Sequence, residues 1–142
     1  MTTVRHLLDR KGRALYVVGP EDPVLTAIRL MAEHHVGALL VMQQESLLGI
    51  ISERDYARKV ILLGRSSNDT PVRQIMSSPV ITVSLDTTVG DCMRLMTEHR
   101  IRHLPALDAR RVVGVISIGD LVKAVIEDQQ ETIAQLESYI HS

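Results

Sequence analysis

The sequence predicts an α+β fold built from two copies of one small unit, each with the order strand, helix, strand, strand, helix. The main observation is an internal duplication. Residues 112–122 match residues 47–57 when the chain is shifted by 65 places without a gap, and the same shift pairs Met31 with Met96 and His34 with His99. The chain has 142 residues, 45% of them hydrophobic, which is material for one module of two halves and not for a second independent domain.

Apolar patterning places the elements of the first copy. Strands are expected at residues 14–18, 38–42 and 47–52, because each run is short and rich in aliphatic residues. Between the first two strands, apolar residues recur at helical spacing from Val24 to Met31. We expect Asp22 to cap this helix, Pro23 to be its first residue and Gly37 to end it. A second helix is expected over residues 54–63.

The second copy repeats this order, with strands at residues 80–83, 103–107 and 112–117 and helices at 89–99 and from Gly119 onward. We place repeat one at about residues 15–63 and repeat two at about residues 80–127. The polar linker between them, residues 64–79, is expected to contain a short helix over residues 72–76. A short helical turn is expected at residues 3–8. The last helix continues over 128–142 with apolar residues at Ile133, Leu136 and Ile140, so it needs a partner surface, either the body of the protein or a second subunit.

The two copies are expected to pack together about a pseudo-twofold axis, because one unit of this size cannot cover both faces of its sheet. Equivalent clefts would then open at the seam between the repeats. In each copy a strand ends in Ser-x-x-Asp and runs straight into a helix. This places a hydroxyl and a carboxylate beside the free N–H groups of a helix N-terminus, an edge that can bind a polar ligand.

Composition excludes several classes of function. The formal net charge is −1, and the chain has three Tyr but no Phe or Trp, which argues against a nucleic-acid surface. No apolar run reaches membrane-spanning length, and Arg5, Asp9 and Arg10 interrupt any signal-peptide core. The single cysteine, Cys92, is expected on the apolar face of a helix and suits a reducing compartment. We therefore expect a cytoplasmic protein without a membrane or nucleic-acid partner.

The duplicated order and the junctions Gly49-Ile50-Ile51-Ser52-x-x-Asp55 and Gly114-Val115-Ile116-Ser117-x-x-Asp120 closely resemble a tandem pair of cystathionine-β-synthase (CBS) domains, a Bateman module. The resemblance runs from about Leu15 to Val125 and looks like a stand-alone bacterial CBS-pair protein. It implies a regulatory protein, not an enzyme, that modulates a partner protein. The clefts between its repeats would bind AMP, ADP, ATP, NAD(H) or S-adenosylmethionine. It also implies a homodimer with four repeats in a flat disc.

The resemblance also implies roles for individual residues. Asp120 and Asp55 would hold the ribose hydroxyls, since an ionised carboxylate accepts hydrogen bonds from both hydroxyls of a vicinal diol at roughly 1.5–3 kcal/mol per bond. Ser117 and Ser52, three places earlier, would line the nucleotide. Adenine would lie against two sets of residues, His103, Leu104, Pro105, Val80, Ile81 and Thr82 in the second copy and Ala38, Tyr16 and Val17 in the first.

Basic side chains that would meet phosphate differ between the copies. They are Arg102 with His103 in the second copy, near Arg100, and Arg54 with Arg58 in the first. We therefore expect two unequal sites, with the one at Asp120 preferred.

Plainer interpretations stay open for the same residues. Ser-x-x-Asp is also the pattern of a helix cap, which a duplication would copy as well. The histidines, such as His99 and His103, lack the spacing and acidic or thiolate partners of a metal site, so no metal is expected. Cys92 has no adjacent base, so we expect no nucleophilic role. The extended last helix leaves room for a purely structural oligomerisation module.

Overall fold

The computed structural model describes residues 1–141, which form two compact units. The N-terminal unit is Ala14–Ile81. The C-terminal unit combines Met1–Arg13 with the chain from Thr82 onward. Each unit contains one copy of the repeat around a three-stranded sheet, which confirms the predicted fold class.

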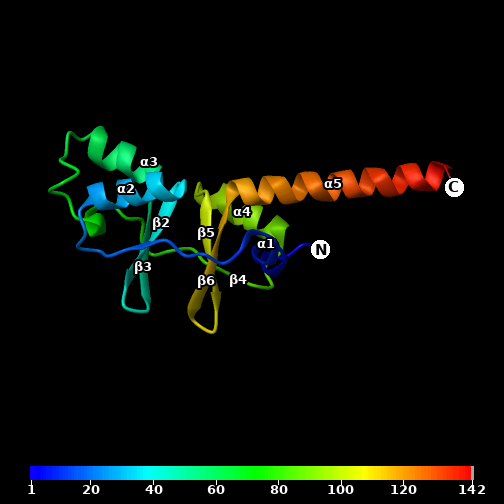
Figure 1. Ribbon diagram of the computed structural model, residues 1–142, viewed down its shortest axis with the longest axis horizontal. Coiled ribbons are helices and arrows are strands. Elements are labelled where there is room, and N and C mark those ends of the chain that lie inside the picture. Colours follow the sequence, from blue (N-terminus) through cyan, green and yellow to red (C-terminus); the bar gives the residue numbers. More distant parts are fainter. Residues whose placement is uncertain (142) are drawn as a thin grey trace. The chain divides into compact units, whose positions relative to one another are not determined.

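The N-terminal unit contains β1 (Val17–Val18), α2 (Val24–His34), β2 (Ala38–Gln43), β3 (Ser46–Ser52) and α3 (Glu53–Tyr56). In its sheet β2 pairs antiparallel with β3 (Figure 1). β1 runs parallel to β2, and in the β2–β3 register Ala38 lies opposite Ser52. Its core is aliphatic, as the lack of Phe and Trp requires, with Leu39, Val41 and Ile51 almost fully buried.

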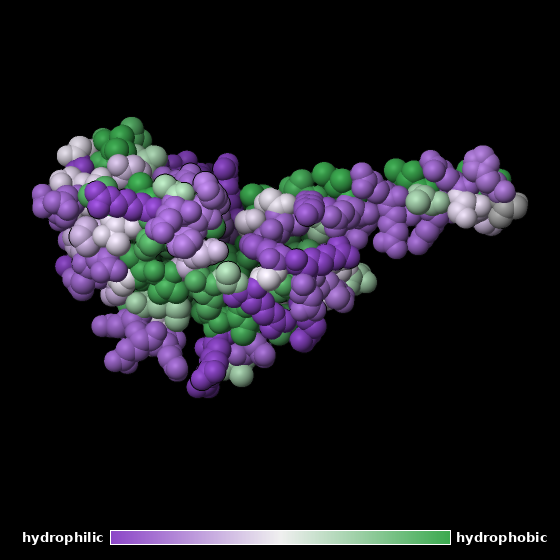
Figure 2. Space-filling view, viewed as in Figure 1, coloured by the Kyte–Doolittle hydropathy of each residue, from purple (hydrophilic) through white to green (hydrophobic). Residues whose placement is uncertain are grey.

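The C-terminal unit contains α1 (Val4–Lys11), β4 (Val83–Ser84), α4 (Val89–His99), β5 (His103–Asp108), β6 (Arg111–Ser117) and α5 (Ile118–His141). Its sheet has the same order, β4-β5-β6, and the same register, with His103 opposite Ser117. The first half of α5 buries Leu121 and Ala124, whereas its apolar side chains further along stay on the surface, on one edge of the helix (Figure 2).

Each unit is completed by a segment from outside its own repeat. In the C-terminal unit this is α1: the Val4 amide donates to the Thr87 carbonyl oxygen at 2.9 Å, and Leu8 packs so tightly on β6 that a Cβ at Gly114 would lie 2.5 Å from it. In the N-terminal unit the linker does this, because Val24 N donates to Thr70 O at 2.8 Å and Met76 lies over Gly49. Any Cβ at either position would force these neighbours to shift.

The edge strands are shorter than the sequence predicted. The strands expected at residues 14–18 and 80–83 are reduced to Val17–Val18 and Val83–Ser84. Each edge strand pairs with a single neighbour over only two residues, in parallel register. The other residues of the two runs, 14–16 and 80–82, are not part of a ladder, so the apolar runs alone overestimated the length of these strands.

Helix ends also differ from the prediction. The first helix of repeat one begins at Val24, with Pro23 as N-cap, because the Asp22 carboxylate instead accepts from the Gly19 amide at 2.8 Å. It ends at His34, and His35 takes the left-handed conformation expected of Gly37. The helix expected over 54–63 starts at Glu53 and changes to a π-helix over Ala57–Ile61.

The remaining short elements lie where the sequence predicted them, but their lengths differ from the prediction. The turn expected over 3–8 is the two-turn helix α1, and the helix expected over 72–76 is a 3-10 turn, Val72–Gln74. The predicted extension of the last helix is confirmed as far as His141, and residue 142 lies outside the described part. None of the described helices is long and apolar enough to cross a membrane.

Candidate functional site

Both Ser-x-x-Asp motifs form reciprocal helix caps. At the first junction the Asp55 amide donates to Ser52 Oγ at 3.1 Å, and the Ser52 amide donates back to Asp55 Oδ2 at 3.0 Å. The same pair of bonds joins Asp120 and Ser117, at 3.2 and 2.8 Å. This is the capping box, which satisfies backbone N–H groups at the start of a helix. The capping interpretation is therefore confirmed. If these carboxylates also bind a ligand, they must do so through lone pairs that the capping bonds do not use.

The junction at Asp120 leaves one carboxylate oxygen over. Both Ser117 N and Lys11 Nζ donate to Oδ2, the latter at 2.7 Å, and within residues 1–141 no hydrogen bond reaches Oδ1. The Asp120 side chain is 23% exposed. Burial acts to raise the pKa of Asp120, but the hydrogen bonds from Lys11 and Ser117 outweigh it and lower the pKa below its ordinary value. This junction therefore presents an ionised, accessible acceptor.

Lys11 is the residue that sequence reasoning missed. It is the last residue of α1, and its ammonium group also donates to the carbonyl oxygen of Val115 at 2.7 Å. Val115 lies in β6, two residues before the capping Ser117. No local pattern predicts this contact, because Lys11 lies outside the duplicated stretch and 109 residues away from Asp120.

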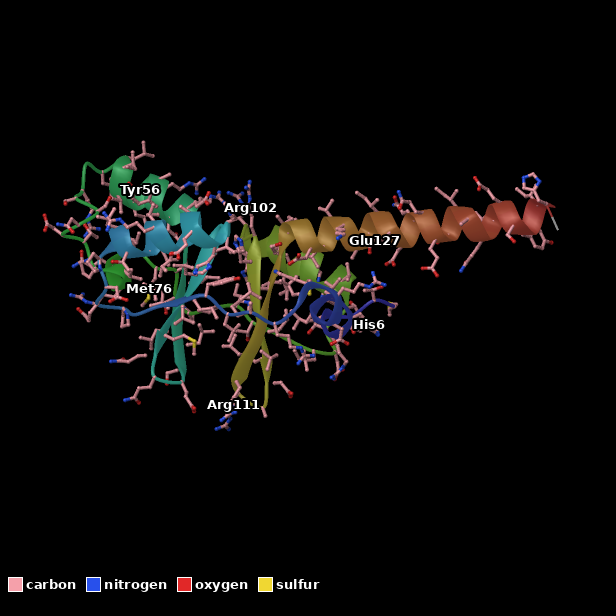
Figure 3. The ribbon with its side chains drawn as sticks, in the orientation of Figure 1. His6, Tyr56, Met76, Arg102, Arg111 and Glu127 are labelled. Atoms are coloured by element: carbon pink, nitrogen blue, oxygen red, sulfur yellow. The ribbon has the colours of Figure 1, made fainter. Side chains whose placement is uncertain are left out.

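His103 and Arg102 lie at the same end of the C-terminal unit. His103 is opposite Ser117 in the β5–β6 pairing, and the Arg102 carbonyl oxygen accepts from the first amide of α5, Ile118 N, at 2.9 Å (Figure 3). Burial, reinforced by the positive charges of Lys11 and Arg102 and opposed by Asp120, lowers the pKa of His103. The imidazole is therefore neutral at neutral pH, while the Arg102 side chain is exposed.

The junction at Asp55 is closed by its own unit. Ser52 Oγ donates to Asp55 Oδ2 at 3.1 Å, in addition to the backbone bond from Ser52. Oδ1 accepts a hydrogen bond from Ser77 Oγ at 3.3 Å and forms an ion pair with the Lys59 ammonium at 3.2 Å. Only 12% of the Asp55 side chain is exposed. Both oxygens of the Asp55 carboxylate are thus occupied.

The structure distributes the other expected residues unevenly. Leu104 and Pro105 are buried in the sheet, where they lie opposite Ile116 and Val115. Val80 and Ile81 belong to the N-terminal unit, whereas Thr82 begins the second part of the C-terminal unit. In the N-terminal unit, Tyr16 stacks on His34 with ring centroids 4.3 Å apart, Val17 is 42% exposed, and Ala38 lies opposite Ser52. Arg54 and Arg58 are exposed on the helix that follows.

Metal and thiol chemistry find little support in the described residues. Within 1–141, no three His, Cys, Asp or Glu side chains are placed together as metal ligands would be. Cys92 is fully buried, as expected, and burial together with the charge of Asp91 raises the pKa of its thiol to about 11. Such a thiol is protonated at neutral pH and is a poor nucleophile.

Known proteins resemble this chain over most of its length. The family model of the CBS domain matches residues 4–61 and 72–127. The CBS domain-containing protein CBSX3 of Arabidopsis thaliana, a mitochondrial protein, is 41% identical over 149 residues, covering 98% of this chain and 72% of that protein.

Solved structures agree with the sequence matches. A protein with CBS domains from Burkholderia ambifaria, proposed to act in signal transduction, is 52% identical with a TM-score of 0.87, over 90% of this chain and 96% of that one. The CBS domain pair of protein MJ0100, solved in complex with 5′-methylthioadenosine and S-adenosyl-L-methionine, is 23% identical and has a TM-score of 0.80, over 90% of this chain and 98% of that one. At 23% identity, the similarity to the MJ0100 domain pair concerns the fold alone.

Proposed function

This chain belongs to the CBS domain family, and on that basis we propose that it is a regulatory protein that binds an adenosine nucleotide at the Asp120 junction and so changes its affinity for a partner protein. The candidate ligands are AMP, ADP, ATP, NAD(H) and S-adenosylmethionine. The MJ0100 domain pair supports this class of ligand, because both of the ligands in its structure contain adenosine. Coupling between two binding events in such a protein is typically about 1–3 kcal/mol.

The observation that carries the proposal is the uncommitted oxygen of Asp120. Oδ2 is fixed by the Ser117 amide and Lys11, which orients the carboxylate, and the side chain keeps 23% of its surface exposed, so we assign Oδ1 as the acceptor for a ribose hydroxyl. A charge-assisted hydrogen bond of this kind is worth roughly 1.5–3 kcal/mol. The cap therefore positions the ligand-binding group instead of competing with it.

Positive charge near this carboxylate suits the phosphate of a nucleotide. Lys11 lies 2.7 Å from Asp120, and the exposed Arg102 lies one residue before His103. The neutral imidazole of His103 has both a donor and an acceptor nitrogen to offer the base. We propose that the Asp55 junction is filled less readily, since both of its carboxylate oxygens are already bonded.

The adenine contacts at Val80, Ile81 and Thr82, and those at Ala38, Tyr16 and Val17, stay predictions. So do a cytoplasmic location, a homodimer and the identity of the regulated protein. An enzymatic role has less support than a regulatory one, because the resemblances are to CBS-domain proteins.

The test is calorimetric titration of the adenosine ligands into the full chain and two matched variants, Asp120→Asn and Asp55→Asn. Asparagine keeps an oxygen for the capping bond but removes the charge. Asp120→Asn should weaken the tightest ligand about tenfold or more, which corresponds to about 1.4 kcal/mol, while Asp55→Asn should leave that binding step almost unchanged. Equal losses in the two variants, or no heat with any ligand, would refute the proposal.

A second candidate is a structural oligomerisation module without a ligand. The observation that favours it is that both Ser-x-x-Asp motifs serve as caps, so their duplication needs no ligand. If no ligand binds but removal of residues 128–142 abolishes self-association, this second function is the better description.

A further inference from the structure

The second half of α5 carries an apolar seam with a heptad repeat. Taking Ile126, Ile133 and Ile140 as a positions, the d positions are Val122, Gln129 and Leu136. The five apolar side chains of this α5 seam are exposed, by 45% at Val122 and by 73% at Ile140. Apolar a and d positions at this spacing are the pattern by which one helix packs along another.

The seam needs a cover that its own unit does not supply. Contacts hold α5 to α1 as far as residue 128, through Arg10 with Glu127 at 2.7 Å and Thr2 with Asp128 at 3.2 Å. From Gln129 to His141 every residue is exposed, and the helix runs on beyond its sheet (Figures 1 and 2). A helical segment of about 13 residues with no tertiary packing is marginal in water.

We propose that the α5 seam pairs with the α5 seam of a second copy of this chain, in antiparallel orientation. In the register that places Ile126 opposite the partner's Leu136, Val122 lies opposite the partner's Ile140. Gln129 then lies opposite the partner's Ile133. Every a position therefore meets a d position, and apolar contact extends over the whole seam. This pairing does not depend on nucleotide binding.

Charge complementarity selects both the occupant and the orientation. In the antiparallel register, Lys123 flanks the seam beside the partner's Glu137, and symmetry repeats this ion pair at the other end. In a parallel pair the flanking neighbours are Val125 with the partner's Gln130 and Thr132 with the partner's Glu137, which form no ion pair. The seam thus matches its own reversed copy in both shape and charge.

The test uses disulfide cross-linking of the full chain in a glutathione buffer. Ile126→Cys and Leu136→Cys replace exposed side chains, so the core is left intact, and the native Cys92 is buried. Mixing the two variants should give a 126–136 cross-linked heterodimer at least about tenfold above the control mixture of Glu131→Cys with Ser138→Cys, which lie on the opposite face of the helix.

The outcomes separate the alternatives. Cross-linking of Ile126→Cys with itself would show a parallel pair, and a mixture no better than the control would show that another protein or nothing covers the seam. Either result overturns the proposal.

Charge reversal gives a second test in the same mixture. Lys123→Glu or Glu137→Lys alone should reduce cross-linking about fivefold, and both reversals in one chain should restore it. Failure of the double reversal to restore cross-linking would refute the ion pair.

Discussion

Lys11 and Asp120, which are 109 residues apart in the sequence, form an ion pair of 2.7 Å at the start of α5. The pair ties the segment that precedes the first repeat to the junction of the second. It also fixes the carboxylate that we propose as the ribose acceptor. The N-terminal segment is thus part of the C-terminal unit and of its candidate site.

Replacing Lys11 with Met should destabilise the protein by at most about 1 kcal/mol, because the lysine is 40% exposed and solvent screens the pair. The loss should depend on pH. The pKa of Asp120 is lowered in the folded state, so its contribution to stability is present above the unfolded pKa of about 3.9 and is lost as pH falls through the folded pKa. Urea unfolding at about pH 7 and about pH 3 measures this. A difference from the native chain that is as large in acid as at neutral pH would contradict it.

The sequence was sufficient for the elements that have a strong local signal. The duplication predicted the same element order in both copies, and the two sheets also share their register, because His103 opposite Ser117 repeats Ala38 opposite Ser52. The α4 bounds, Val89–His99, agree with the prediction. These features follow from short apolar runs and helical spacing, which neighbouring residues determine.

The rest depended on contacts that the sequence does not encode locally. Lys11 meets Asp120 only because α1 joins the C-terminal unit, and Ser77 closes Asp55 only because the linker joins the N-terminal unit. The difference between an open and a closed carboxylate therefore could not be predicted from two matching Ser-x-x-Asp motifs. The basic residues near the second copy predict two unequal binding sites, and this stays a prediction.

His103 should make the protein less stable in mild acid. Burial and nearby positive charge lower its pKa in the folded state, so the unfolded chain binds a proton more readily. Its contribution is present above the unfolded pKa of about 6.5 and is lost as pH falls through the lower folded pKa. The free energy of unfolding should decline over this range, and less so in His103→Gln. If both proteins decline in parallel, His103 is not the group responsible.

The thiol of Cys92 should react with a disulfide reagent only when the protein opens. It is fully buried, and its pKa is raised to about 11, so little thiolate exists in the native state. The labelling rate should therefore rise steeply through the urea transition. Rapid labelling of the native protein, at a rate similar to that of the unfolded chain, would show that α4 does not protect this residue.

Alanine at Gly49 should destabilise the protein more than alanine at Gly114. At Gly114 the new Cβ meets the ends of the Leu8 side chain, at 2.5 Å and 2.8 Å, and a leucine can shift in part. At Gly49 it meets Met76 at 2.6 Å and also the Ser77 carbonyl oxygen at 2.9 Å, which is backbone and cannot move aside cheaply.

Overpacking of this kind costs about 1–3 kcal/mol, and we expect Gly49→Ala at the upper end of that range and Gly114→Ala at the lower end. Gly90→Ala is the control, because it lies in the first turn of α4 and its Cβ has no neighbour closer than 4.0 Å. That change should be neutral or stabilise by up to about 1 kcal/mol. Urea unfolding of the three variants gives the order directly. If Gly114→Ala proves the most harmful, α1 is held against β6 more rigidly than the linker is held against β3.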